Sequence, residues 1–367
     1  MTRQVLLAAL SAAISLLSLL AGSGIGKAYD LYPITSMVVS VIFLLFVVGR
    51  TLSDGYVRRR ELFLTLALVA VIVVWPAVCG NKLQGAQYGW LLALPYVIGL
   101  IPLSQKDIRT ICLSCGMVGL AVVASRVFLN VFGNWNRNDI AMAGFFGCAV
   151  CSVAPWETWG QKIFHKILLM VMAVLILQLD SRSCLIGTLV LALFSLGILK
   201  KGIFSRKRWL RWVVLFTPIA VVIITVLFQN SQIFDSINAW STQYFSKPVF
   251  NGRNLIWEEG LRLVKETPWL GKGYINNGYW HNCALSALTA FGIVGYYVWV
   301  AYFENIMVDT MRFQRDTCLQ YSIVAFLTIM VQQSFELGLI STTGSMLPYL
   351  ILGIMLGRMR YLKKQTK

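Results

Sequence analysis

The stretch CALSALTAFGIVGYYVWVAYF, Cys283 to Phe303, runs for 21 residues without a charged side chain. A transmembrane helix needs about 20 such residues. Similar runs recur along the whole chain of 367 residues, of which 57% are hydrophobic and 13% are charged. A soluble domain carries about 25% charged residues. The runs are continuous rather than alternating, which favours helices over barrel strands. The sequence therefore predicts an all-α polytopic membrane protein with a single integral membrane domain, residues 1–367.

The apolar runs predict twelve transmembrane helices joined mostly by short loops. We expect the first run to be a retained helix, because no small-residue cleavage site follows it. The predicted ranges are 4–22, 34–49, 62–80, 89–104, 111–131, 139–155, 163–179, 184–199, 212–228, 283–303, 317–332 and 344–357.

Basic residues indicate how these helices are oriented. When the N-terminus is placed in the cytoplasm, most of the 32 Lys and Arg residues fall in cytoplasmic segments. The positive-inside rule then puts both termini in the cytoplasm. The net charge of +17 is a topology signal, and its dispersal over many short loops argues against a nucleic-acid partner.

One predicted extracytoplasmic loop, residues 229–282, is far longer than the others. Loops of this length are usually functional or disordered, and its many aromatic residues argue against disorder. Its segment NLIWEEGLRLVKE, Asn254 to Glu266, has the apolar spacing of a short amphipathic helix. We therefore expect a folded loop on the outer side of the membrane.

His281 stands at the end of this loop, directly before the run quoted above. A neutral imidazole is a natural general base near pH 7, and Asn282 beside it could orient the ring. The alternative is a surface histidine without a role. The other histidine, His165, lies between Lys162 and Lys166 and is expected at the cytoplasmic membrane interface.

Arginines on the same predicted side could bind an anion. Arg182 lies in a tight turn with Asp180, and it either grips an anionic headgroup or simply pairs with Asp180. Arg253 precedes the amphipathic helix, whose N-terminus also favours anions. Arg262 is a weaker candidate. Arg137 and Glu336 could contact substrate, although helix capping and solvated loops are the more ordinary interpretations.

Several other classes of site are not indicated. The sequence has no phosphate-binding glycine loop and no His, Asp and Glu cluster with metal-ligand spacing. Two pairs of cysteines, Cys112 with Cys115 and Cys148 with Cys151, have CxxC spacing. They lie among apolar residues, so we expect them to be small packing residues.

The remaining candidates define a reaction. Two arginine forks suit a pyrophosphate, aromatic faces suit sugars, and a general base suits activation of a hydroxyl. Together they predict transfer of a glycan from a lipid pyrophosphate on the outer leaflet. No metal or other cofactor is needed if the arginines neutralise the leaving group.

Three segments resemble the signature of the O-antigen ligase and polymerase superfamily. They read DSRSCLIG from Asp180, NGRNLIWEEGLRLVKETPWLGKGY from Asn251, and HNCALSALTAFGIVGYY from His281. The resemblance implies a glycosyltransferase C-type membrane fold and a polyprenyl (undecaprenyl) pyrophosphate-linked glycan as partner. It also implies pyrophosphate binding by Arg182 and Arg253 and a base or substrate-activating role for His281. Some polymerases of this superfamily carry an arginine and a glycine separated by ten residues, and Arg262 and Gly273 fit that spacing. The resemblance therefore leaves open whether Arg253 or Arg262 is the functional arginine of the loop.

These observations favour an inverting glycosyltransferase that polymerises lipid-linked repeat units into a surface polysaccharide in the bacterial cytoplasmic membrane. A chain-length regulator protein is an expected partner of such an enzyme. The nearest alternative is an O-antigen ligase, which moves the finished glycan onto a lipid core or protein. A non-enzymatic transporter of lipid or polysaccharide is the alternative from another class.

Overall fold

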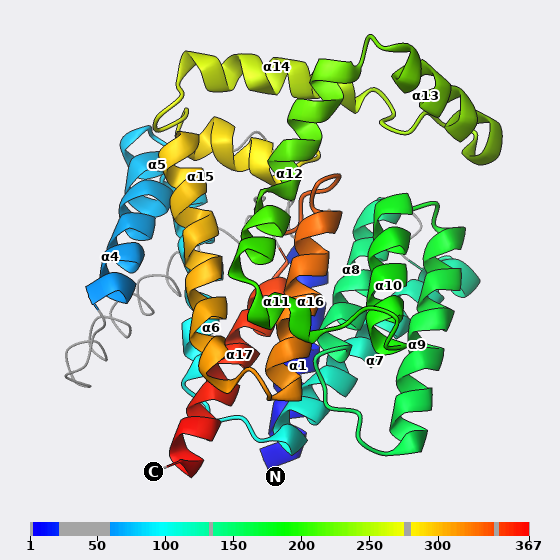
Figure 1. Ribbon diagram of the computed structural model, residues 1–367, viewed down its shortest axis with the longest axis vertical. Coiled ribbons are helices and arrows are strands. Elements are labelled where there is room, and N and C mark those ends of the chain that lie inside the picture. Colours follow the sequence, from blue (N-terminus) through cyan, green and yellow to red (C-terminus); the bar gives the residue numbers. More distant parts are fainter. Residues whose placement is uncertain (1–2, 22–58, 132–134, 275–279, 341–344, 367) are drawn as a thin grey trace.

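The computed structural model describes residues 3–21, 59–131, 135–274, 280–340 and 345–366, and their regular structure is helical (Figure 1). The helices are α1 (Arg3–Ala21), α4 (Arg59–Leu68), α5 (Trp75–Val78), α6 (Lys82–Gly99), α7 (Gln105–Leu129), α8 (Arg137–Cys151), α9 (Trp159–Gln178), α10 (Arg182–Ser195), α11 (Gly202–Arg206), α12 (Arg208–Phe228), α13 (Gln232–Phe245), α14 (Arg253–Glu266), α15 (Cys283–Thr310), α16 (Thr317–Gln332) and α17 (Leu347–Gln365). A π-helical turn, Val69–Val74, joins α4 to α5, and a 3-10 turn, Met311–Phe313, follows α15.

The predicted spans coincide with helices wherever the structure describes them. The range 34–49 lies outside the described residues, and the other eleven each overlap a helix or, for 62–80, a run of three helical pieces. Among the described residues, four segments are long and apolar enough by themselves to cross a membrane, namely α7, α9, α12 and Cys283–Phe313. The protein is therefore membrane-embedded and all-helical in the part described.

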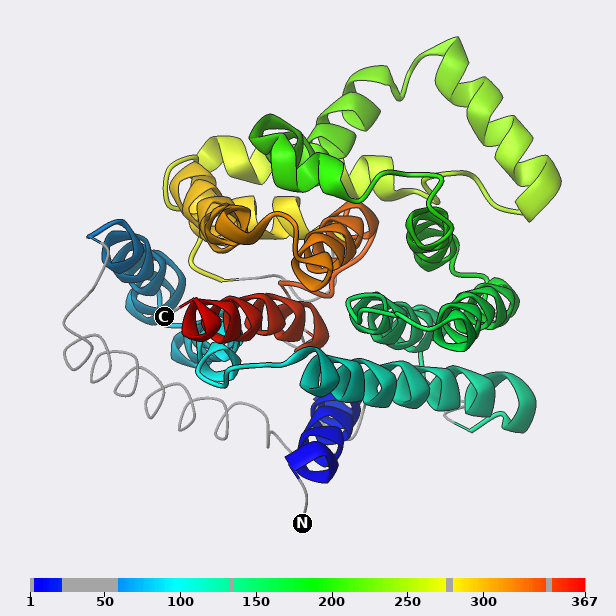
Figure 2. The same cartoon turned by 60° about the horizontal axis from the view of Figure 1, so that its bottom comes forward.

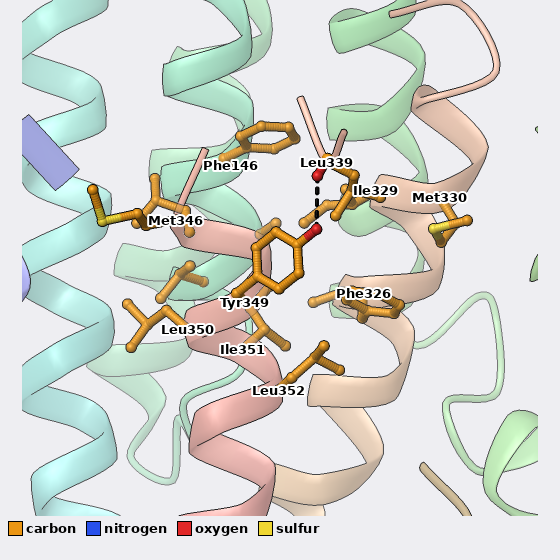
Figure 3. Packing of buried hydrophobic residues seen from close by; sticks show 14 of the residues in the cluster. Phe146, Phe326, Ile329, Met330, Leu339, Met346, Tyr349, Leu350, Ile351 and Leu352 are labelled. Atoms are coloured by element: carbon orange, nitrogen blue, oxygen red, sulfur yellow. Dashed lines mark hydrogen bonds between the residues drawn. The ribbon is translucent and has the colours of Figure 1, made fainter. Parts of the chain in front are cut away.

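The centre of the bundle is packed by aromatic and aliphatic side chains of α8, α16 and α17 (Figure 3). Phe146, Phe326 and Ile329 are at most 1% exposed there. The hydroxyl of Tyr349 donates a hydrogen bond of 2.6 Å to the carbonyl of Leu339, which lies after α16. This bond ties the segment after α16 to the core.

Small residues let α7 and α8 approach closely. A Cβ added to Gly147 would lie 2.8 Å from the carbonyl oxygen of Cys115, and one added to Gly116 would lie 2.9 Å from Cβ of Cys151. Such contacts are a common way for helices to associate in a membrane. Cys112, Cys115, Cys148 and Cys151 are fully buried free thiols, as expected of packing residues.

The run that was predicted as one continuous span, 283–303, is broken at Gly292. This residue has φ 66° and ψ −171°, a conformation that residues with a side chain rarely adopt. Figure 1 shows the first half of α15 lying across the end of the bundle and the second half running down it. Hydropathy misses the break because both halves are equally apolar.

A short segment before α15, Pro268 to Gly273, satisfies the backbone groups freed by this break. The amides of Ile293 and Val294 donate to the carbonyls of Pro268 and Trp269, at 2.7 and 3.2 Å. In the other direction, the amides of Lys272 and Gly273 donate to the carbonyls of Thr289 and Ala290, both at 2.8 Å. Hydrogen bonds from this segment therefore replace bonds that an unbroken helix would make within itself.

The helices α13 and α14 form a layer across one end of the bundle, while both chain termini lie at the other end (Figures 1 and 2). A buried ion pair links the start of α12 to the second half of α15. Arg211 and Glu304 are both 0% exposed, and the guanidinium donates to both carboxylate oxygens at 2.8 and 2.9 Å. Breaking such a pair leaves an uncompensated buried charge, so it fixes the register of the two helices.

Candidate active site

His281 is held by its neighbours in an unusual backbone conformation. Its φ is 47°, in the left-handed region, and its side chain is 39% exposed. On one side, the indole Nε1 of Trp257 in α14 donates a 2.7 Å hydrogen bond to the carbonyl of Trp280. Both tryptophans are buried. The imidazole thus stands on a fixed backbone beside α14.

Asn282 anchors the other side of His281. Its side-chain Nδ2 donates to the carbonyls of Pro218 in α12 and Ser334 after α16, at 2.9 and 2.8 Å. Its Oδ1 accepts from the amide of Leu285 and caps α15. Asn282 is 0% exposed, and its side chain joins α12, the segment after α16 and the start of α15.

Glu336 lies between His281 and Arg253. Its Oε1 accepts a 3.0 Å hydrogen bond from Nη2 of Arg253, and its Oε2 is 3.7 Å from Nδ1 of His281. The carboxylate is 9% exposed. Gln333 shapes the segment that carries it, because its side-chain oxygen accepts from the amides of Gly338 and Leu339.

Arg253 occupies the first position of α14. Two left-handed residues, Asn251 and Gly252, turn the chain into this helix, and no side chain caps its N-terminus. The rings of Phe250, Trp257 and Phe335 pack on one another with centroids 5.9–6.4 Å apart. This cluster joins the start of α14 to the residue before Glu336, which explains why Arg253 and Glu336 meet.

Arg262 lies on the opposite face of α14. Nine residues at about 100° each place it about 180° from Arg253. It is exposed and pairs with Glu259 and Glu266 of the same helix at 2.6 and 2.5 Å. Its hydrogen bonds lower the pKa of the Glu259 carboxyl below its usual value. Trp257 and Gly260, by contrast, share the inner face with Arg253 and are buried.

Asp180 and Arg182 form a second group at the turn between α9 and α10. Asp180 pairs with Lys247, so the expected pairing of Asp180 with Arg182 is not what the structure has. Arg182 instead donates to Oγ of Ser241 in α13 and to the carbonyl of Pro248, both at 3.1 Å. The turn therefore holds the segment between α13 and α14.

That segment connects the two groups. Arg182 binds at Pro248, five residues before Arg253, and five residues span at most about 18 Å. Arg137 is exposed at the start of α8, and no hydrogen bond or ion pair among the described residues joins it to His281 or Glu336. The structure thus gathers Arg253, His281, Asn282 and Glu336, places Arg182 and Asp180 beside the same segment, and leaves Arg137 and Arg262 apart.

Several supporting residues could not be recognised from the sequence. Trp257 and Trp280 looked like two members of an aromatic loop, and their pairing depends on the fold of α14 onto α15. Ser241 and Lys247 carry no motif, although they bind the turn at Arg182 and Asp180. His165 is buried, and its ring nitrogens lie 3.1 Å from Oγ of Ser152 and of Ser195.

The fold defines a membrane-embedded, all-helical protein whose candidate polar residues gather at one end of the bundle. More specifically, residues 167–300 match the sequence model of the O-antigen ligase family. This match covers about a third of the chain and confirms the resemblance of its three motifs to the O-antigen ligase and polymerase superfamily. The matched stretch includes Arg182, Arg253 and His281, while Glu336 lies outside it. No curated protein matches the chain significantly.

Proposed function

We propose that the protein is an inverting membrane glycosyltransferase that polymerises polyprenyl pyrophosphate-linked repeat units into a surface polysaccharide. The reaction takes place at the outer face of the bacterial cytoplasmic membrane. The observation that carries this proposal is the convergence of His281, Glu336 and Arg253 within a chain of the O-antigen ligase and polymerase superfamily.

His281 acts as the general base in this proposal. Glu336 lies on the Nδ1 side of the ring, and a proton on Nδ1 directed at this carboxylate leaves Nε2 as the acceptor. Nε2 takes the proton of an acceptor hydroxyl on a second lipid-linked unit. The hydroxyl oxygen attacks the anomeric carbon as the bond to the pyrophosphate breaks, which inverts that centre.

Arg253 and Arg182 bind the pyrophosphate of the donor. One nitrogen of Arg253 is engaged by Glu336, and a guanidinium has five N–H donors, so others remain for phosphate oxygens. The uncapped N-terminus of α14 adds further backbone N–H groups. The positive charge stabilises the leaving pyrophosphate as it develops. We assign this role to Arg253 rather than Arg262, because Arg262 faces away from His281.

The acceptor distinguishes polymerisation from ligation. The family that matches is described as O-antigen ligase, and a ligase would use the same donor chemistry with a lipid A-core or protein acceptor. The decisive experiment incubates purified protein in lipid nanodiscs with a polyprenyl pyrophosphate-linked repeat unit alone, or with added core lipid. A ladder of products from the repeat unit alone supports polymerisation. A single transfer that depends on core lipid would instead show that the protein is a ligase.

The same assay tests the transporter alternative. We expect His281→Ala to lower turnover about 10²–10⁴-fold, the usual contribution of general acid–base catalysis. Binding of the lipid-linked unit should persist in this variant. Movement of the glycan across the bilayer without turnover, unaffected by His281→Ala, would instead identify a transporter.

A further inference from the structure

The helix α13 has an exposed apolar stripe. Ile233, Ile237 and Trp240 recur at helical spacing and are 68%, 45% and 55% exposed. Gln232 and Asp235 are also exposed and lie about 140° and 160° from Ile237, on the polar side of the same helix. An amphipathic helix with this division is typical of the boundary between a membrane and water.

Contacts with the rest of the protein fix which way α13 is turned. Oγ of Ser241 accepts from Arg182 at the top of α10 and donates to the carbonyl of Lys247, and Ser241 is 1% exposed. Ile237 lies about 40° from Ser241 around the helix, and Ile233 and Trp240 lie about 80° and 100° from it on the same side. The apolar stripe therefore flanks the face that packs on the bundle, whereas Gln232, about 180° from Ser241, is turned away from it.

The stripe also continues a surface that must contact lipid. The preceding helix α12 is apolar enough to cross a membrane, and its last turns expose Ile223, Ile224, Leu227 and Phe228. Only Gln229, Asn230 and Ser231 separate α12 from α13. Figures 1 and 2 show α13 projecting from the layer past the side of the bundle formed by α9 and α10. Lipid beside those helices would lie next to α13.

We propose that α13 lies flat in the outer boundary of the bilayer, with Ile233, Ile237 and Trp240 inserted among the lipid chains and headgroups. Tryptophan is enriched at that level of a membrane. The sequence of α13 contains no Lys or Arg, so the attachment is apolar and independent of anionic lipid. Through Ser241, the embedded helix holds the guanidinium of Arg182 at the height of the lipid phosphates. This inference rests on the membrane-embedded fold and not on the proposed catalytic activity.

The test compares two spin labels at positions that are both exposed in the protein and lie about 160° apart on α13. Cys79, the exposed native thiol, is replaced by Ser, and Ile237→Cys or Asp235→Cys is then labelled in full-length protein in phosphatidylcholine nanodiscs. Power saturation measures collisions with oxygen, which concentrates in lipid, and with a water-soluble nickel chelate. We expect the label at position 237 to favour oxygen several-fold more than the label at position 235. Adding phosphatidylglycerol should leave this difference unchanged.

Two outcomes would overturn the proposal. Equal exposure of both labels to the nickel chelate would place α13 in water. Protection of position 237 from oxygen as well as nickel would show that protein covers the stripe, for example a second copy of the chain. Monodisperse elution of each labelled variant from a sizing column confirms that it is folded.

Discussion

At the scale of the residue, the position of His281 is set by hydrogen bonds of the residues on either side of it. Trp280 is held through its carbonyl by Trp257, and Asn282 is held through its amide by two carbonyls. Glu336 then lies between the imidazole and Arg253. The sequence predicted His281, Arg253 and Glu336 as candidates, but their meeting depends on three helices, which local patterns do not encode. Asn282 was predicted to orient the imidazole, and its side chain bonds to the backbone of Pro218, Ser334 and Leu285.

Arg253 and Arg262 form a matched pair on opposite faces of one helix. We expect Arg253→Ala to lower kcat/KM for glycan transfer about 10²–10³-fold, because a donor that neutralises the leaving group is lost. Arg262→Ala should leave it nearly unchanged, because Arg262 lies on the opposite face of α14 and pairs with Glu259 and Glu266 of the same helix. Steady-state transfer assays check both variants. Equal losses in the two would contradict the assignment.

Asn282 makes a prediction about stability. Asn282→Ala should lower the free energy of unfolding by about 2–4 kcal/mol, because it removes a helix cap and leaves two buried carbonyls without their donor. Asn136→Ala removes only the exposed cap of α8 and should cost about 1 kcal/mol. Denaturant unfolding in detergent compares them. Equal losses of unfolding free energy in the two variants would show that the bonds from Asn282 to Pro218 and Ser334 do not stabilise the fold.

At the scale of the element, the sequence predicted the helices well and the break in α15 not at all. Hydropathy reports how apolar a segment is, and the residues on either side of Gly292 are alike in that respect. The break depends on Gly292 being able to adopt φ 66° and on carbonyls and amides offered by residues 268–273. Only the folded chain brings those groups to it. The same limit explains why α13 was not predicted, since its packing face and its apolar stripe are about 90° apart.

The break makes Gly292 sensitive to one added methyl group. A Cβ at this position would lie 2.3 Å from the backbone of Trp269, in addition to the cost of its φ. We expect Gly292→Ala to lower the free energy of unfolding by about 2–6 kcal/mol. Gly160→Ala, where nothing lies within 4 Å, should be neutral or slightly stabilising. Thermal unfolding of both variants measures the difference, and a neutral Gly292→Ala would show that the break is not required.

At the scale of the whole molecule, the two ends of the bundle differ in kind. Both termini lie at one end, and the layer of α13 and α14 lies at the other (Figure 1). The distribution of basic residues predicts that the end with the termini faces the cytoplasm. The proposed site would then face outward, where lipid-linked glycans are joined.

Cysteine labelling in whole cells tests this orientation. In a Cys79→Ser background, Arg262→Cys on α14 should react with a membrane-impermeant maleimide in cells whose outer barrier has been removed. Lys363→Cys on α17 should react only after the cytoplasmic membrane is opened. Both native residues are exposed, so accessibility within the fold does not separate them. The reverse pattern would invert the proposed topology.

The break at Gly292 also bears on how the protein is made. A straight helix over 283–303 would be about 32 Å long, enough to enter the membrane as an ordinary span. In the finished molecule only the second half of α15, about 27 Å from Ile293 to Thr310, runs down the bundle. Hydropathy and the folded state therefore describe the same residues differently. Residues 268–273, which precede α15 in the chain and so are made before it, supply the hydrogen bonds that stabilise its break.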